Sequence, residues 1–125
     1  MAFILLVETS RMECMKNTES LKKNYEFARV YKRGKYFTSN NLTLYILDRN
    51  SKEKRLGITV SKKAYGRSVD RNRIRRLVKE SYKSFEDSIN TNTDMVFVIR
   101  KNKEIPPFAS IKSEVNYLLK QSGLM

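Results

Sequence analysis

The sequence predicts a single domain of the α+β class, with helices packed on a small sheet. Three observations support this prediction. The chain has 125 residues, of which 40% are hydrophobic, and this is enough for one modest core without a metal or a disulfide. Its apolar residues recur at helical spacing in some segments and alternate in others. No internal repeat or linker divides the chain, and the predicted order of elements is α-β-β-β-α-β-α.

The first half of the chain is predicted to contain one helix and three strands. The run NYEFARVYKRGK begins at a candidate N-cap, Asn24, carries apolar residues at helical spacing and ends near Gly34, a typical helix stop. Two β-prone runs flank a turn-like Ser-Asn-Asn and predict strands over residues 36–38 and 42–47. Alternation in RLGITVS predicts a third strand over residues 55–61.

The second half is predicted to contain two helices and one strand. A helix begins at Ser68, with an apolar stripe that should pack inward and a polar stripe on its opposite side. The nearly continuous apolar run MVFVIR, residues 95–100, fits a central strand that is buried on both faces. A last helix follows Pro106-Pro107 and stops at Ser122-Gly123. The inward stripe of the first of these helices comprises Ile74, Leu77, Val78, Ser81 and Phe85, and the outward stripe comprises Asn72, Arg75, Arg76, Lys79 and Lys83.

The charge of the chain predicts a polyanionic partner. Lysine and arginine number 26 against 13 acidic residues, so the formal net charge is +13. Residues 52–83 hold twelve basic and three acidic residues, which gives +9 of that total. A solvated face that keeps the protein soluble is the plainer interpretation, but solubility does not require such clustering. Nucleic acid is therefore the leading candidate.

The composition also excludes several kinds of site. There is no histidine, so imidazole catalysis and histidine-containing metal sites are excluded, and the carboxylates form no recognisable metal-binding motif. We therefore do not expect a self-sufficient nuclease. Cys14 is the only cysteine, which fits a reducing compartment and makes the cytoplasm the default location.

Residues 1–14 differ in character from the rest of the chain. The opening run MAFILLV is too short to span a membrane, and no basic residue precedes it. Our hypothesis is that Met15 is the natural start, because MKNTESLKKN is a polar, basic opening that suits this domain. We accordingly predict an N-terminal extension over residues 1–14, which this hypothesis makes non-native, and a domain over residues 15–125.

Two groups of residues are candidates for binding RNA. The helical run RNRIRRLVKE crowds guanidinium groups near a helix N-terminus, where the macrodipole opposes them, and guanidinium groups bind phosphate in a bidentate manner. Only Asp70 and Glu80 could pair with these arginines within the helix, so a purely structural interpretation is weaker. The second group interleaves rings and cations, as in proteins that bind single strands, although Phe27 and Tyr31 taken alone are more often core residues. That group comprises Phe27, Tyr31, Lys32, Lys35, Tyr36, Tyr45, Lys62 and Lys63.

Three segments, NYEFARVYKRGK, LGITVSKK and SVDRNRIRRLVKE, resemble in this order the protein subunit of bacterial ribonuclease P, and the likeness covers nearly everything from Met15 onward. The resemblance implies a single-domain α-β-β-β-α-β-α sandwich with a small mixed sheet and a left-handed β-α-β crossover, a fold like that of ribosomal protein S5 domain 2. It also implies a protein that binds a catalytic RNA and the 5′ leader of precursor tRNA, and so promotes endonucleolytic removal of that leader.

The resemblance also assigns residues by matching positions. The signature helix facing the RNA subunit would present Arg71, Asn72, Arg73, Arg75, Arg76 and Lys79. A central cleft for the single-stranded leader would be lined by Phe27, Tyr31, Tyr45, Lys62 and Lys63. The segment AYGRSVD is one residue longer than the usual family spacing, and no protein metal site is assigned.

In this interpretation the chemistry belongs to Mg²⁺ bound mainly by the RNA subunit, and no side chain of the protein is catalytic. The expected partners are ribonuclease P RNA and precursor tRNA, with no membrane partner and a monomeric protein. The main alternative is a ribosomal or RNA-assembly protein that binds folded RNA without catalysis. A DNA-binding regulator lacks the preceding helix and turn of a helix-turn-helix motif, and a membrane-surface protein ranks last.

Overall fold

The computed structural model describes residues 18–48, 54–89, 93–102 and 104–125. The predictions about residues 1–14 lie outside these ranges. In chain order the elements of the described part are β1 (Thr18–Ser20), α2 (Asn24–Arg33), β2 (Lys35–Thr38), β3 (Leu42–Asp48), β4 (Lys54–Thr59), α3 (Ser68–Phe85), the 3₁₀ turn η1 (Glu86–Ser88), β5 (Thr93–Ile99) and α4 (Phe108–Gln121).

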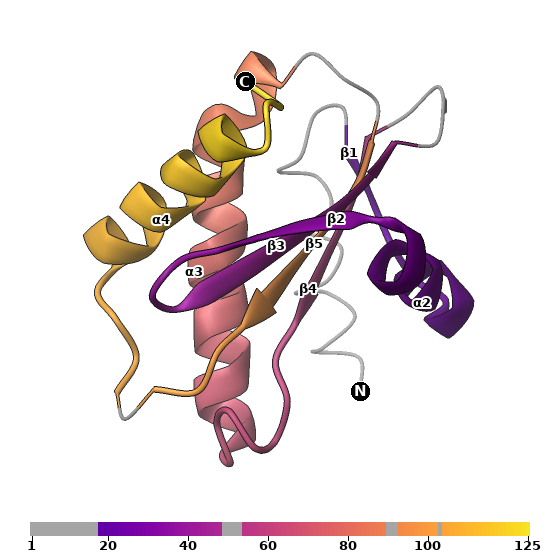
Figure 1. Ribbon diagram of the computed structural model, residues 1–125. Coiled ribbons are helices and arrows are strands. Elements are labelled where there is room, and N and C mark those ends of the chain that lie inside the picture. Colours follow the sequence, from indigo (N-terminus) through magenta and orange to yellow (C-terminus); the bar gives the residue numbers. More distant parts are fainter. Residues whose placement is uncertain (1–17, 49–53, 90–92, 103) are drawn as a thin grey trace.

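The strands form one mixed sheet in the order β1-β4-β5-β3-β2. Strand β4 pairs in parallel with both β1 and β5, whereas β3 is antiparallel to β5 and β2 is antiparallel to β3. The parallel neighbours β4 and β5 are joined through α3, which forms the predicted β-α-β crossover (Figure 1). The predicted α+β class with a small mixed sheet is therefore confirmed.

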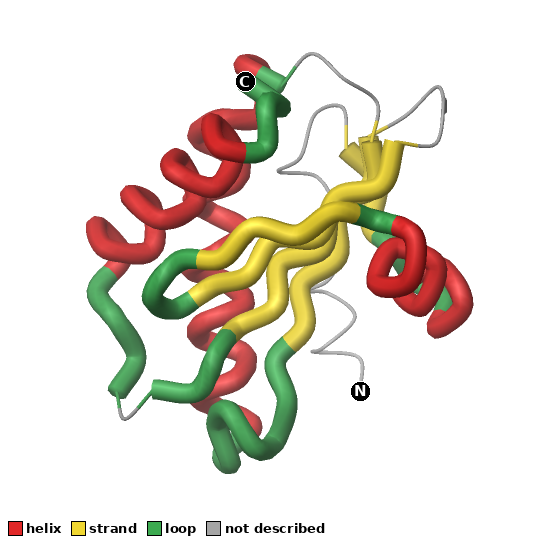
Figure 2. Tube along the Cα trace, in the orientation of Figure 1, coloured by secondary structure: helices red, strands yellow, loops and turns green. Residues whose placement is uncertain are grey.

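The helices cover the two faces of the sheet unequally. Helices α3 and α4 lie together on one face, and the short helix α2 lies on the other, near one end of the strands (Figures 1 and 2). The molecule thus has three layers, as the predicted sandwich requires. We call the face under α3 and α4 the core face and the opposite one the α2 face.

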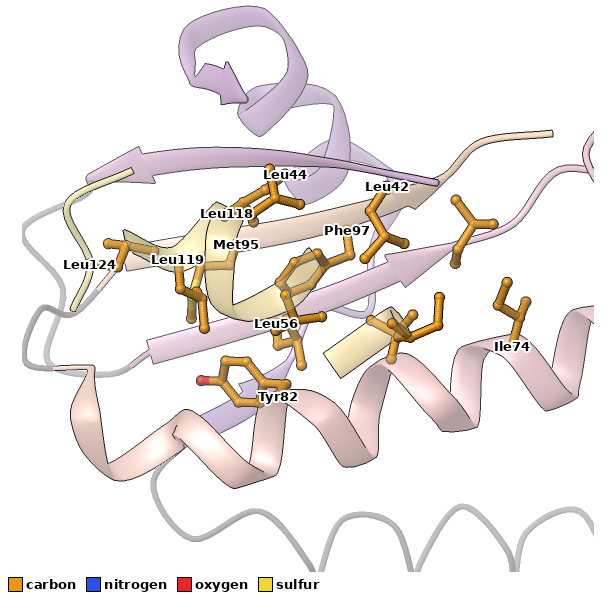
Figure 3. Packing of buried hydrophobic residues seen from close by; sticks show 14 of the residues in the cluster. Leu42, Leu44, Leu56, Ile74, Tyr82, Met95, Phe97, Leu118, Leu119 and Leu124 are labelled. Atoms are coloured by element: carbon orange, nitrogen blue, oxygen red, sulfur yellow. The ribbon is translucent and has the colours of Figure 1, made fainter. Parts of the chain in front are cut away.

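The main core lies between the sheet and the pair α3 and α4 (Figure 3). Phe97 on the central strand β5 and Tyr82 on α3 are both fully buried there. Each large apolar side chain buried in this way contributes roughly 1.5–3 kcal/mol. Other buried members are Leu42, Leu44, Leu56, Ile74, Val78, Met95, Ile111, Val115, Leu118 and Leu119.

Two elements escaped the sequence-based prediction. Strand β1 has three residues, TES, and η1 has the polar sequence EDS, so neither carries an apolar pattern. A buried hydrogen-bond network fixes them, because the Thr18 hydroxyl donates to Glu86 Oε2 at 2.5 Å and lies 2.7 Å from the Tyr82 hydroxyl. The Thr18 proton is engaged with Glu86, so Tyr82 donates to Thr18. Burial raises the pKa of Tyr82 well above its usual value, which keeps this donor neutral.

The ends of α2 differ in detail from the prediction. The N-cap is Lys23 rather than Asn24, because the Glu26 side chain accepts the Lys23 backbone N–H at 2.9 Å and so satisfies this end of the helix. Gly34 does end the helix, but with an ordinary φ of −80°. A glycine is required there because a Cβ would lie 2.4 Å from the carbonyl oxygen of Ile46 on β3.

Candidate nucleic-acid interface

Helix α3 presents the predicted basic residues on the side away from the core. Ile74 and Val78 are fully buried and fix the orientation of the helix. Asn72, Arg73 and Arg76 are exposed, whereas Arg71, Arg75 and Lys79 are half-buried. Of the predicted outward stripe, Asn72 and Arg76 are exposed, Arg75, Lys79 and Lys83 are half-buried, and none is fully buried.

The six predicted RNA-binding residues of α3 do not form a single row. Arg71 donates through Nη1 to the backbone oxygens of Tyr65 and Gly66, at 3.0 and 2.8 Å, and so holds the loop before the helix. Arg75 donates to the Asn72 side-chain oxygen.

Arg73 lies on the other flank of the helix, on a cavity of about 530 Å³ that loop residues 104–107 also line. Arg73 shares this cavity with the acidic residues Asp70 and Glu104. The RNA-binding roles of the six residues stay predictions.

Helix α2 is held on its face of the sheet by apolar packing around the fully buried Val30 and by three charged side chains. Arg55 on β4 donates to Asp94 on β5 through Nε and Nη2, at 3.0 and 3.1 Å, and donates through Nη1 to Glu26 on α2. We call Glu26, Arg55 and Asp94 the charged lock. All three side chains are largely buried, so each charge depends on its partners.

The contacts of the charged lock also shift the pKa values of Glu26 and Arg55. Hydrogen bonds from the Lys23 and Lys22 backbone N–H groups, together with the nearby Arg55 charge, hold the pKa of Glu26 below its usual value despite burial. The hydrogen bond to Asp94 raises the pKa of Arg55. Both shifts favour the charged forms of Glu26 and Arg55, whose ion pair fixes the first turn of α2 over β4.

The sequence analysis did not predict the charged lock. It counted Lys54 and Arg55 in the basic run over residues 52–83, which we assigned to nucleic-acid binding. The structure corrects this for both residues. Lys54 is buried and donates to the backbone oxygens of Glu86 and Ile89, at 3.0 and 3.3 Å. Only the placement of Arg55 inside a predicted strand could have indicated an internal role, and Lys54 lay just before that strand.

The predicted cleft residues on α2 differ in exposure. Phe27 is half-buried and packs over Gly57, where an added Cβ would lie 2.4 Å from the Phe27 ring. One turn later, Tyr31 is 40% exposed. The glycine lets Phe27 approach the sheet closely, so Phe27 closes one end of this face and its role in binding a ligand stays a prediction.

Beyond Phe27, three tyrosine rings lie together on the α2 face. The ring of Tyr31 meets that of Tyr45 on β3 edge-on, with centroids 4.9 Å apart, and the ring of Tyr36 on β2 lies 5.8 Å from that of Tyr45. The Tyr31 hydroxyl lies 3.4 Å from Thr59 Oγ1 on β4. We call Tyr31, Tyr36 and Tyr45 the tyrosine platform. It brings together two of the predicted cleft residues and adds Tyr36.

The two predicted lysines lie on the turn that leads from β4 to α3. The Ala64 backbone N–H donates to both the side chain and the carbonyl of Ser61, each at 3.1 Å, and this closes a tight turn. Lys62 and Lys63 are exposed at its tip, while Ala64 is buried. The turn therefore places two positive charges between the end of β4 and the beginning of the arginine-rich helix.

Among the described residues, no three acidic, cysteine or histidine side chains form a group that could hold a metal ion. In the same part of the chain, no helix is both long and apolar enough to cross a membrane.

Comparison with known proteins identifies the family. The family model described as Ribonuclease P matches residues 15–123. The chain belongs to the ribonuclease P protein family. The ribonuclease P protein component of Clostridium kluyveri is 44% identical over 106 residues, which cover 83% of this chain and 94% of that protein. The corresponding protein of Clostridium novyi is 42% identical over 88% of this chain and 98% of its own length.

A solved structure of a family member agrees with the fold. The ribonuclease P protein of Staphylococcus aureus superposes with a TM-score of 0.76 and 29% identity, covering 84% of this chain and 95% of that one. The resemblance noted in the sequence is thus confirmed. So is the assignment as the protein component of an endoribonuclease that acts in tRNA processing.

Proposed function

We propose that this ribonuclease P protein binds the catalytic RNA through the exposed side of α3 and holds the 5′ leader of precursor tRNA on the tyrosine platform. The observation that carries this proposal is the continuity of the two surfaces. Thr59, next to Tyr31, ends β4, and the exposed Lys62 and Lys63 follow it directly on the turn into α3. An RNA strand on the platform would therefore meet cations on its way to the arginine-rich helix.

The platform suits a single strand rather than a duplex. Unpaired bases stack on tyrosine rings while nearby cations track the phosphates, and such stacking is tolerant of sequence because every base has a π-face. Phe27 and the charged lock fix α2 at one end of the sheet face. The helix therefore does not cover the rest of that face. Tyr31 and Tyr45 are the residues that we expect to contact the leader first, beside Lys62 and Lys63.

Helix α3 suits a folded RNA. Arg73 and Arg76 are exposed one turn apart on the helix and would neutralise phosphates of the RNA subunit, together with Asn72, Arg75 and Lys79. Arg71 would act partly by holding the loop at residues 65–66, to which it donates. Reduced repulsion between substrate and RNA subunit would lower the Mg²⁺ concentration that cleavage requires.

The chemistry in this proposal resides in the RNA. Bound Mg²⁺ would activate water and stabilise the leaving oxygen. The described residues of the protein do not fit a metal cage, so no step is assigned to a metal held by this chain. The protein contributes binding and charge neutralisation. A monomeric protein that works in the cytoplasm is part of the same proposal, since the strong positive charge disfavours self-association.

The test is precursor tRNA cleavage at low Mg²⁺ with the ribonuclease P RNA of the same organism, with and without this protein, and with the product 5′ end mapped. We expect stimulation at the mature tRNA terminus. Folded, RNA-binding protein that gives no stimulation would overturn the proposal and favour a ribosomal or RNA-assembly role. Co-purification with ribosomes would then be the next measurement.

A further inference from the structure

Tyr36 is the most exposed member of the tyrosine platform. It lies on the edge strand β2, where the next residue, Phe37, packs against the main core, so Tyr36 points to the α2 face. Its side chain is 65% exposed. A ring that gains so little burial contributes little to stability, so it can be replaced with little effect on the fold.

The register of the sheet places Tyr36 beside the other two rings. Tyr36 pairs directly with Tyr45, and their rings are tilted by 36°. Across the sheet the order is Thr59 on β4 with Tyr31 above it, then Tyr45 on β3, and finally Tyr36 at the β2 edge. From β4 to β2 there are three strand spacings, or about 14 Å.

The three rings, whose centroids lie 4.9 and 5.8 Å apart in turn, present more surface than one base needs. Four-stranded sheets that recognise RNA stack two or three bases on their aromatic side chains. Tyr31 and Tyr45 contact each other edge to face, with an interplanar angle of 75°, so the edge of one ring covers a face of the other and the pair offers one stacking surface. Tyr36 leaves a ring face available at the margin of the sheet. Two exposed cations, Lys32 and Arg33, end α2 just before β2 in the chain.

We propose that Tyr36 forms an additional base-stacking subsite at the β2 edge, which takes one more unpaired base of the leader than Tyr31 and Tyr45 can hold. This inference rests on the proposed function of the platform and deepens it. Because stacking does not read hydrogen-bonding groups, the subsite should detect the presence of a base and ignore its identity. It should also respond to ring loss and not to loss of the Tyr36 hydroxyl.

The experiment uses the reconstituted holoenzyme and precursor tRNAs whose leaders carry a single abasic nucleotide, moved one position at a time. Affinity is measured for the native protein and for Tyr36→Ala, Tyr36→Phe and Tyr31→Ala. The matched control is Tyr117→Ala, since Tyr117 is a 51% exposed tyrosine on α4, away from the α2 face.

With the native protein, loss of the base that stacks on Tyr36 should weaken binding by about 5- to 150-fold, the range measured for a single base–aromatic stack. Tyr36→Ala should bind the intact leader more weakly by the same factor and become insensitive to an abasic nucleotide at that one position. Tyr36→Phe and Tyr117→Ala should retain the native pattern. Replacing the base at that position by any other should change affinity little.

Two results would overturn the inference. One is an abasic profile for Tyr36→Ala that matches the native profile at every position. The other is a uniform loss of affinity for all leaders, which would indicate damage to the sheet edge. Failure of the broader proposal is distinguishable, because Tyr31→Ala would then also leave every leader position unaffected. If Tyr31→Ala changes the profile and Tyr36→Ala does not, leader binding at Tyr31 is supported and the Tyr36 subsite does not exist.

Discussion

Both faces of the sheet carry aromatic residues, but the two faces use them for different purposes. On the core face, the side chains of β3, β4 and β5 are covered by two long helices, and Phe97 and Met95 are fully buried. On the α2 face, one short helix covers the end nearest the charged lock, and the tyrosine platform beside it remains exposed. The aromatic ring of Phe97 serves packing, and the rings of Tyr31 and Tyr36 remain available to a ligand.

The difference teaches where a small domain can place a binding surface. The core face supplies the stability, since apolar burial is the dominant favourable contribution to folding. The α2 face can then leave rings exposed, because α2 is anchored by ionic hydrogen bonds at one end and does not need to bury the whole face. The following predictions test this division, beginning with the largest expected effect.

Phe97→Ala should destabilise the protein by about 3–5 kcal/mol, because it opens a cavity in a fully packed core. Urea unfolding followed by circular dichroism measures this free energy. The matched control is Tyr36→Ala, which truncates an aromatic residue on the α2 face and should cost less than about 1 kcal/mol. Equal losses from the two truncations would show that the α2 face also supports the fold.

Arg55→Ala should destabilise the protein by about 3 kcal/mol, because the carboxylates of Glu26 and Asp94 would remain in a largely buried position without their partner. The same urea experiment applies. Removing the Glu26 charge as well, in Arg55→Ala/Glu26→Gln, should recover part of the loss. A loss from Arg55→Ala that stays within experimental error would mean that α2 is held by apolar contacts alone.

Tyr31→Ala should weaken precursor tRNA binding by the holoenzyme by about 5- to 150-fold and leave mature tRNA binding unchanged, since only the precursor has a leader to stack. Equilibrium binding of both RNAs, measured at one salt concentration, decides this. Tyr117→Ala on α4 is the control and should change neither affinity. Equal losses for the two RNAs with Tyr31→Ala would remove the platform from substrate recognition.

Arg73→Ala/Arg76→Ala should weaken association with ribonuclease P RNA and flatten its salt dependence. If each guanidinium neutralises one phosphate, the slope of log K against log salt should fall in magnitude by about 2. Titration of labelled RNA over a range of salt concentrations gives the slope. Lys112→Ala/Lys120→Ala removes two exposed cations from α4 and should leave it unchanged. An unaltered slope in the arginine variant would contradict the α3 assignment.

The smallest effect concerns pH. The pKa of Glu26 is lowered in the folded protein, so its ionised form contributes stability above the ordinary glutamate value of 4.5. That contribution should be lost as pH falls below this value and through the lower folded pKa. Urea unfolding of Glu26→Gln and of the native protein should therefore differ most near neutral pH and converge in acid. A constant difference would show that Glu26 acts through its shape and not its charge.

The comparison of the two faces also shows which parts of the fold could be predicted from the sequence. The predicted strands over residues 36–38, 42–47, 55–61 and 95–100 agree with the observed β2, β3, β4 and β5 to within two residues at each end. These segments carry their periodicity locally. The three residues of β1 could not be found in this way, because their strand conformation depends on Thr18 contacts with residues more than sixty positions away.

The candidate site also contains some residues whose placement could be predicted from the sequence and others whose placement could not. The outward stripe of α3 and the candidacy of Tyr31 and Tyr45 followed from spacing and from the family resemblance. The internal use of Arg55 and Lys54 did not, because a charged residue looks the same in sequence whether it meets solvent or a buried carboxylate. Nor could spacing show what these arginines meet: Arg73 lines a cavity together with loop residues 104–107, and Arg75 donates to Asn72.

The sequence by itself determined the class of fold, the polyanionic partner and the family, because composition, charge and local periodicity are properties of the chain alone. The tertiary structure decided which face of the sheet stays exposed and which rings share it. Tyr36 meets Tyr45 only through the β2–β3 register, and the first turn of α2 lies over β4 and β5 where Arg55 joins Glu26 to Asp94. Contacts between residues distant in the chain depend on register and helix placement, which no local pattern specifies.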